Sequence, residues 1–94
     1  LFNNNYSDAT NNGHMGTPAN GVLFNAIHKV EGSHSMFFDG SNDLVNVGGT
    51  NTGFLHEPFT QWSVAFWMKA NLLTNTRIIY DQGGSDNGIA FRIN

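Results

Sequence analysis

Cysteine is absent from this chain, and basic residues are scarce. Without a thiol, the 94 residues cannot form a disulfide, a thiolate nucleophile or a cysteine-based zinc site. Only four Lys and Arg stand against seven Asp and Glu, so no basic patch exists for a phosphate backbone, and no nucleic-acid partner is expected. The apolar runs are too short to span a bilayer, and no membrane span is expected either.

Charge of either sign is also low, at 12% of residues, about half the usual share for soluble domains. Polarity comes from amides and hydroxyls instead, with 14 Asn in the chain. A surface rich in Asn, Thr and Gly is common in extracellular β proteins. The chain begins with Leu1 and ends on "GIAFRIN", which reads like the middle of a strand, so we expect a processed or partial chain.

Period-two alternation dominates the apolar pattern, and no stretch has a helical period over three turns. Turn residues recur at roughly ten-residue intervals, which is typical of a β-sandwich or barrel. Residues 1–20 read as an irregular lead-in. The sequence predicts strands over 21–24, 33–40, 44–48, 59–71, 76–81 and 87–94, with 33–40 and 44–48 forming a hairpin about a turn at 39–43.

The segment 59–71, "FTQWSVAFWMKAN", gives the strongest strand prediction. One predicted face is continuously apolar and carries Trp62, Val64, Phe66 and Met68. The other face carries Ser63, Ala65, Trp67 and Lys69, with Trp67 as its single large ring. This pattern indicates a sandwich strand with one mostly buried face.

Four motifs in order resemble one family: "YSDATNNGHMGTPANGVLF", "MFFDGSNDLVNVG", "FTQWSVAFWMKAN" and "IIYDQGGSDNGIAFRIN". Together they are similar to the N-terminal part of the laminin-G-like domains of the concanavalin A-like lectin/glucanase superfamily. The resemblance implies an all-β, antiparallel β-sandwich of jelly-roll type, with residues 1–94 as a single partial domain. Because one sheet cannot bury its inner face alone, the remaining strands are expected from further sequence or another chain, including a homo-oligomer.

Calcium is the metal that the acidic turns suggest. Asp39, Asn42 and Asp43 cluster oxygen atoms in one turn, which either caps its own backbone or binds Ca²⁺. The resemblance further implies a structural calcium at the opening loop, where Asp8 matches the family's first Asp and Asn12 lies close by. The candidate metal ligands are therefore Asp8, Asn12, Asp39 and Asp43. The histidines at 14, 28, 34 and 56 lack the spacing of a zinc site.

Catalysis has no strong candidate in this sequence. Glycoside hydrolysis needs two carboxylates that face one sugar bond, but Glu31 and Glu57 both fall in predicted loops. The Glu-x-Asp-x-x-Glu strand motif that marks hydrolytic relatives on this fold is absent. No nucleophile elbow is present either. We therefore expect the segment not to be an enzyme.

Aromatic rings and loop polar groups are the candidate ligand-binding residues. Tryptophan and tyrosine rings either pack in a core or stack on sugars, and Trp67 stands out because its face is otherwise small or polar. Polar groups in the loop at 81–87 either hydrogen-bond sugar hydroxyls or are solvated. The candidate ligand-binding residues are Trp67, Tyr80, Asp81, Gln82, Asp86 and Asn87.

The resemblance implies a non-catalytic, secreted or cell-surface module that binds carbohydrate or glycoprotein, with a structural Ca²⁺. One alternative is a structural or adhesive subunit of an extracellular fibre, coat or surface layer, assembled by contacts between β-strand edges. Another is the accessory domain of a polysaccharide-degrading enzyme. Fold analogy carries most of this expectation, because one fold supports many functions.

Overall fold

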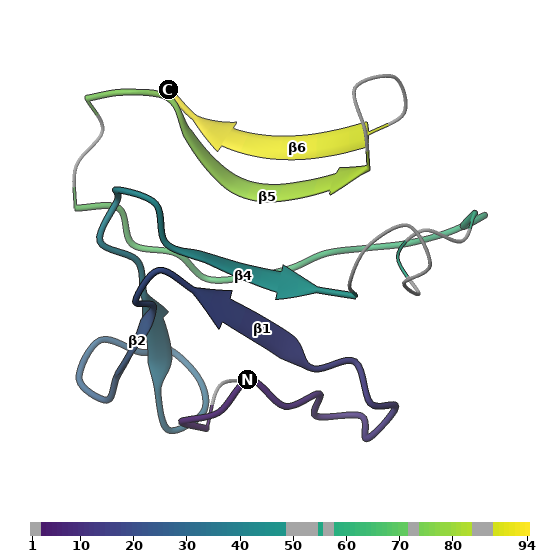
Figure 1. Ribbon diagram of the computed structural model, residues 1–94, viewed down its shortest axis with the longest axis horizontal. Coiled ribbons are helices and arrows are strands. Elements are labelled where there is room, and N and C mark those ends of the chain that lie inside the picture. Colours follow the sequence, from purple (N-terminus) through teal and green to yellow (C-terminus); the bar gives the residue numbers. More distant parts are fainter. Residues whose placement is uncertain (1–2, 49–54, 56–57, 72–73, 84–87) are drawn as a thin grey trace. The chain divides into compact units, whose positions relative to one another are not determined.

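The structure is a computed structural model that describes residues 3–48, 55, 58–71, 74–83 and 88–94 (Figure 1). These residues form short antiparallel strands, turns and extended chain, without an α-helix. The predicted all-β class is therefore confirmed for the described part of the chain. That part also holds no helix with the length and apolar character needed to cross a bilayer. The chain divides into two units, Leu1–Phe54 and Leu55–Asn94.

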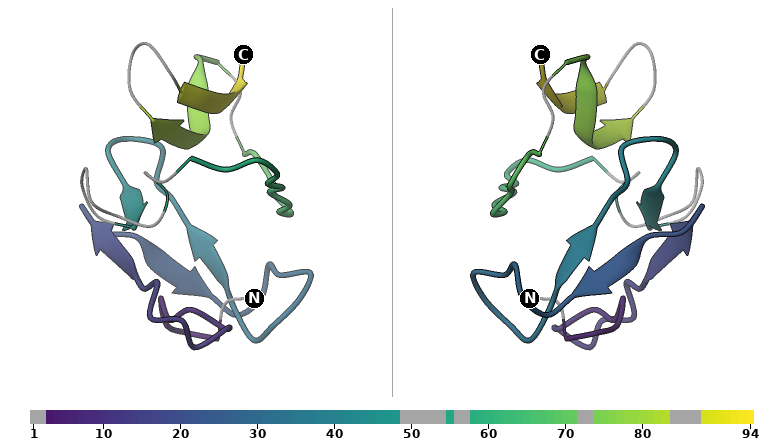
Figure 2. Two further views of the ribbon diagram at one scale, coloured as in Figure 1. Left: turned by 90° about the vertical axis from the view of Figure 1, so that its right-hand side faces the viewer. Right: turned by 90° about the vertical axis from the view of Figure 1, so that its left-hand side faces the viewer.

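The described residues of the first unit form four short strands in two antiparallel pairs. Strand β1 (Gly16–Ala19) pairs with β4 (Leu44–Val47), and β2 (Leu23–Asn25) pairs with β3 (Ser35–Phe37). The second pair is nested inside the first along the chain, with residues 26–34 looping between β2 and β3. Figure 2 views both pairs from two opposite sides.

The two pairs are separate two-stranded sheets that follow one another along the same two runs of chain, 16–25 and 35–47, together called the ribbon below. Between the β1–β4 register and the β2–β3 register, three residues, 20–22, face six residues, 38–43. Asn20 and Gly21 adopt φ angles of 63° and 111°, a region that Asn and Gly tolerate best. The Asn20 Nδ2 donates a hydrogen bond to the Asn42 carbonyl at 2.8 Å, which joins the two sides across the break.

The predicted hairpin of 33–40 with 44–48 is wrong, because each strand pairs elsewhere. Residues 39–43 do form a turn, but it bulges from one side of the ribbon and does not connect paired strands. The prediction of an irregular lead-in over 1–20 is wrong at its end, where β1 begins at Gly16. Pro18 argues against a strand in the sequence, because proline within sheets is confined to edge strands and bulges.

Tyr6 holds the first unit together. Its ring lies 4.7 Å from the Phe24 ring between centroids, and its hydroxyl donates a hydrogen bond to the Val22 carbonyl at 3.2 Å. Its own carbonyl accepts a hydrogen bond from the Gly16 N–H at 2.8 Å. Val22, at 8% exposed, is the buried apolar side chain of the described residues. The small core thus depends on a tyrosine from outside the strands.

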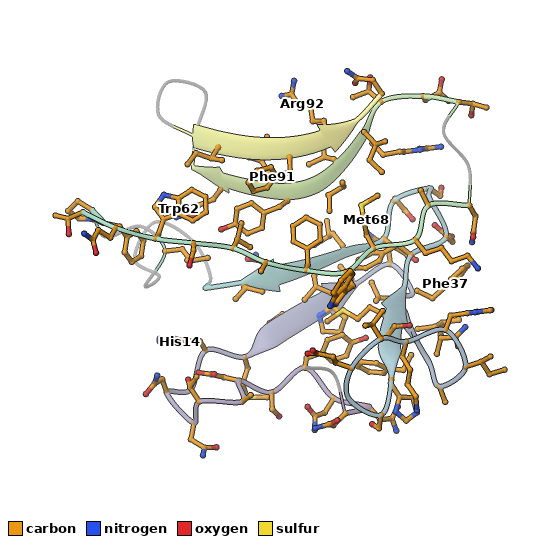
Figure 3. The ribbon with its side chains drawn as sticks, turned by 180° about the vertical axis from the view of Figure 1, so that it is seen from behind. His14, Phe37, Trp62, Met68, Phe91 and Arg92 are labelled. Carbon is orange, nitrogen blue, oxygen red and sulfur yellow. The ribbon has the colours of Figure 1, made fainter. Side chains whose placement is uncertain are left out.

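The second unit contains one hairpin and one extended segment. Strands β5 (Arg77–Gly83) and β6 (Gly88–Ile93) pair antiparallel, with a bulge between Ile78 and Tyr80 that places one extra residue on β5. Figure 3 shows Phe91 on the hairpin side toward the chain segment that carries Trp62, and Arg92 on the other side. The predicted strands at 76–81 and 87–94 are confirmed with small shifts of their ends.

The strand predicted over 59–71 is wrong in its hydrogen bonding. Residues 62–70 belong to no strand in the described part of the chain, although they run as an extended trace (Figure 1). Phe66 nevertheless packs on the hairpin, with its ring centroid 6.3 Å from that of Phe91. The segment and the hairpin therefore face each other through side chains. The alternation of apolar and polar side chains alone could not show that this segment lacks a neighbouring strand among the described residues. A β-strand needs a hydrogen-bonded neighbour as well as an alternating sequence.

Gly16→Ala should destabilise the first unit. A Cβ at this position would lie 2.8 Å from Val45 Cγ1 and 3.4 Å from Tyr6 Cβ, so one of the two side chains must move. Overpacking of this kind costs about 1–3 kcal/mol. Thermal or urea unfolding measures the loss. The double variant with Val45→Ala removes the first clash, and a double-mutant cycle showing no recovery would contradict the packing described here.

Candidate binding sites

The Asp8 carboxylate organises the loop that precedes β1. Its Oδ1 accepts hydrogen bonds from the Thr10 N–H at 2.8 Å and the Thr10 hydroxyl at 2.6 Å. Its Oδ2 accepts from the N–H groups of Asn12 at 3.2 Å and His14 at 3.3 Å. Asn11 and Gly13 take positive φ angles, 61° and 82°, so the loop can curl around the carboxylate. Asp8 thus binds four donors of its own loop.

These hydrogen bonds lower the pKa of Asp8 from its ordinary value, with the Thr10 hydroxyl as the largest cause and the Thr10 N–H next.

The two predicted metal ligands here, Asp8 and Asn12, are close in space. However, the Asn12 Nδ2 donates to the Thr10 hydroxyl oxygen at 2.8 Å, and its backbone N–H points at Asp8. A cation requires oxygen ligands at the carboxylate, but N–H and O–H groups already point there. The opening loop as it stands does not fit a calcium ion.

The turn at 39–43 is also organised by carboxylates. The Ser41 N–H donates to Asp39 Oδ1 at 2.7 Å, and the Asp39 N–H donates to Asp43 Oδ2 at 2.9 Å. These contacts form the backbone-capping turn that the sequence offered as one alternative. Asp43 Oδ1 differs, since it is buried and has no hydrogen-bond partner in the structure. A Cβ on Gly21 would lie 3.6 Å from this atom, so the Asn20–Gly21 turn covers it.

The Asp43 Oδ1 atom makes this turn a better fit for a cation than the opening loop. A buried carboxylate oxygen without a donor is costly unless an ion or water binds it. Sequence spacing could not show that the Asn20–Gly21 turn lies against the Asp43 Oδ1 atom, although the Asn-Gly pair did indicate a turn at residues 20–21. Among the described residues, no group of three or more His, Asp and Glu side chains gathers as a metal site.

Trp67 is the most exposed of the large rings that the sequence singled out. It keeps 75% of its surface exposed, against 47% for its neighbour Phe66, which packs on Phe91. In extended chain, successive side chains point to opposite sides. We therefore place the Trp67 ring on the side of the segment away from the β5–β6 hairpin, where it is available to a ligand.

The Tyr80 and Gln82 side chains contact other residues of the second unit and do not form a free ligand-binding surface. The Tyr80 ring lies 5.8 Å from the Phe91 ring between centroids, and its hydroxyl donates a hydrogen bond to Gln82 Oε1. The Gln82 Nε2 in turn donates to the Leu55 carbonyl at 3.0 Å. Partial burial raises the pKa of the Tyr80 hydroxyl. Both side chains therefore connect the hairpin to the chain that precedes it.

The predicted ligand-binding residues that the structure describes do not all lie on one face of the second unit. Asp81 pairs with Ala90, on the hairpin face opposite Tyr80 and Phe91. Asp86 and Asn87 lie outside the described residues. Of the histidines, His34 sits edge-on to the Phe24 ring at 6.3 Å, and its Nδ1 contacts the Ser33 hydroxyl at 2.8 Å. Among the described members of the predicted set, Trp67 and Asp81 are exposed, and Trp67 is the exposed ring.

Comparisons of the chain with protein-family models, with curated proteins and with solved structures found no match. Function is therefore inferred from the residues and their geometry.

Asp8→Asn should loosen the opening loop, because the amide carries no charge and its NH2 group cannot accept, so the hydrogen bonds to one oxygen are lost and those to the other weaken. For the natural chain, the lowered pKa means that Asp8 stabilises the fold above its ordinary pKa, and that this contribution is lost as the pH falls through the folded value. NMR shifts of the Thr10, Asn12 and His14 amide protons, followed on acidification, should titrate together. Amide shifts that stay constant through the carboxylate range would show that Asp8 does not organise the loop.

Proposed function

We propose that this chain is a non-catalytic extracellular module that binds carbohydrate or glycoprotein through Trp67. The exposed Trp67 ring carries the proposal, because a flat indole offers an apolar face to sugar C–H groups and an N–H to their hydroxyls. The packed neighbour Phe66 anchors the segment beneath it. Backbone held in this way needs less ordering when a ligand binds, which favours affinity.

The sandwich expected from the laminin-G-like resemblance belongs to the same proposal. Within the second unit, the segment 58–71 and the β5–β6 hairpin face each other through Phe66 and Phe91 with no ladder between them. Two layers joined only by side chains are the arrangement of a β-sandwich. We propose that they are parts of the two sheets of a jelly roll.

Trp67→Ala should abolish saturable glycan binding, whereas Trp67→Tyr should keep part of it, because tyrosine retains a flat ring. Isothermal titration against the glycans that bind on an array measures both. The matched control is Trp62→Ala, which removes a tryptophan of the same segment from the opposite face. Equal loss of binding in the Trp62 and Trp67 variants, with circular dichroism unchanged, would contradict a site on the Trp67 side.

The second candidate is an adhesive or assembly subunit, favoured by one specific observation. Residues 62–70 are extended, apolar and outside every strand of the described chain. Backbone N–H and C=O groups without a ladder accept a strand from another chain, which is how many assemblies grow.

Calcium, if held by the first unit, is proposed to bind at the 39–43 turn. The support is the donor-free Asp43 Oδ1, together with Asp39 in the same turn. The ion would neutralise the buried oxygen and tie the turn to the Asn20–Gly21 corner.

Calcium should raise the melting temperature of the natural chain, and Asp43→Asn should remove that rise. Asp8→Asn serves as the matched control, because it changes an acidic loop that does not fit the ion. A melting temperature unaffected by calcium or by EDTA would exclude the site, and a loss of the calcium response in Asp8→Asn alone would relocate it to the opening loop.

A further inference from the structure

Three Asn-Gly pairs occur in the sequence, and the structure describes two of them in full, Asn12–Gly13 and Asn20–Gly21. An asparagine followed by glycine is prone to lose its side-chain amide, because glycine has no Cβ and its backbone nitrogen can approach the preceding side chain closely. All four residues are exposed, so water reaches both pairs. The two pairs differ in the contacts that hold them.

The loop that carries Asn12 is held by its own residues. The Asn12 N–H donates to Asp8 Oδ2 at 3.2 Å, and the Asn12 Nδ2 donates to the Thr10 hydroxyl oxygen at 2.8 Å. A hydrogen bond from the Gly16 N–H to the Tyr6 carbonyl, 2.8 Å long, closes the loop at its base. The loop can therefore open above that bond without disturbing the β1–β4 ladder.

The backbone at Gly13 has room for a new ring. Gly13 takes a φ of 82°, and a Cβ at this position would meet no atom within 4 Å in the described chain. The amide of Asn12 is held by one exposed hydrogen bond to Thr10, and a single bond of this kind contributes little net stability. The amide can thus leave Thr10 and turn toward the Gly13 nitrogen.

The Asn20–Gly21 pair is held by residues distant in the sequence. The Asn20 Nδ2 donates to the Asn42 carbonyl at 2.8 Å, across the break between the two sheets. The pair lies between the end of β1 and the start of β2. The next residue, Val22, is 8% exposed, and its carbonyl accepts the Tyr6 hydroxyl. A ring at this pair would have to move strands and the small core.

We propose that Asn12 is a site of spontaneous deamidation in the folded chain, and that the fold protects Asn20 from the same reaction. The Gly13 nitrogen bonds to Asn12 Cγ and gives up its proton, while the Cγ–Nδ2 bond breaks and ammonia leaves with that proton. Water then opens the succinimide ring. Cleavage of the Cγ–N bond gives aspartate, and cleavage of the backbone C–N bond gives isoaspartate, so amide and water become carboxylic acid and ammonia.

The new carboxylate would disrupt the network around Asp8. The Thr10 hydroxyl already donates its proton to Asp8 Oδ1 at 2.6 Å, and its oxygen accepts the amide that the reaction removes. A carboxylate at position 12 cannot donate to the Thr10 oxygen, and it repels the charge of Asp8. Deamidation should therefore loosen the opening loop.

Incubation of the full chain in mildly alkaline buffer tests the site. Tandem mass spectrometry locates the mass gain that marks an acid in place of an amide, and chromatography separates the aspartate and isoaspartate products. Asn12 should react about tenfold faster than Asn20, because a short loop opens more often than chain held between ladders. Equal rates in the folded chain, or faster reaction at Asn20, would overturn the proposal.

The same incubation in urea separates the effect of the fold from that of the sequence. Both sites are Asn-Gly pairs, so their rates should become similar once the chain is unfolded. A preference for Asn12 that persists unchanged in urea would show that the flanking sequence selects the site, and it would reject protection of Asn20 by the fold.

Three variants complete the test. Asn12→Gln should remove the reaction at position 12, because the longer side chain must close a larger ring, whereas the matched control Asn20→Gln should leave it unchanged. Thr10→Ala frees the Asn12 amide and should raise the rate at Asn12 about threefold. A rate that does not rise in Thr10→Ala would reject the Thr10 contact as a restraint on the reaction.

Discussion

In the described part of the chain, most large apolar side chains stay at least partly exposed, and that constraint governs the rest of the structure. Val22 is the buried apolar side chain of the described residues, whereas rings such as Trp67 and Phe38 stay 75% and 48% exposed. Burial of apolar area is the main favourable term in folding, and we propose that a partner covers part of this exposed surface. Both functional proposals start from it. A ligand is proposed to cover Trp67, and a strand from another chain is proposed to pair with residues 62–70.

Polar groups compensate locally for the small core. The Asp8 and Asp43 carboxylates bind backbone N–H groups of their own loops, and the Tyr6 hydroxyl caps the Val22 carbonyl. Each contact satisfies a group that a loop would otherwise leave to water. The same contacts distinguish the two acidic loops of the first unit. Asp8 uses its oxygens within the loop, whereas Asp43 keeps one buried oxygen without a donor.

Local patterns predicted individual elements better than their pairing. The alternation in β5 and β6, with Gly and Asn between them, indicated a hairpin that the structure has. Around the 39–43 turn the same reasoning gave a wrong hairpin, because Asp39 and Asp43 indicate a turn but do not indicate which strands pair with each other. The ribbon of the first unit pairs residues as far apart as Gly16 and Val47, and sequence spacing contains no signal for that distance.

Composition and alternation by themselves determined the all-β class, the turns and the oxygen-rich loops, because these depend on residue type and near neighbours. Only the tertiary structure decided that Asp8 faces N–H donors, that Tyr80 and Gln82 hold the hairpin to preceding chain, and that Trp67 stays exposed beside a packed Phe66. Only the tertiary structure showed that residues 62–70, despite their strand-like alternation, pair with no strand in the described chain. A ladder requires a second strand at hydrogen-bonding distance, and a one-dimensional pattern cannot state whether that strand is present.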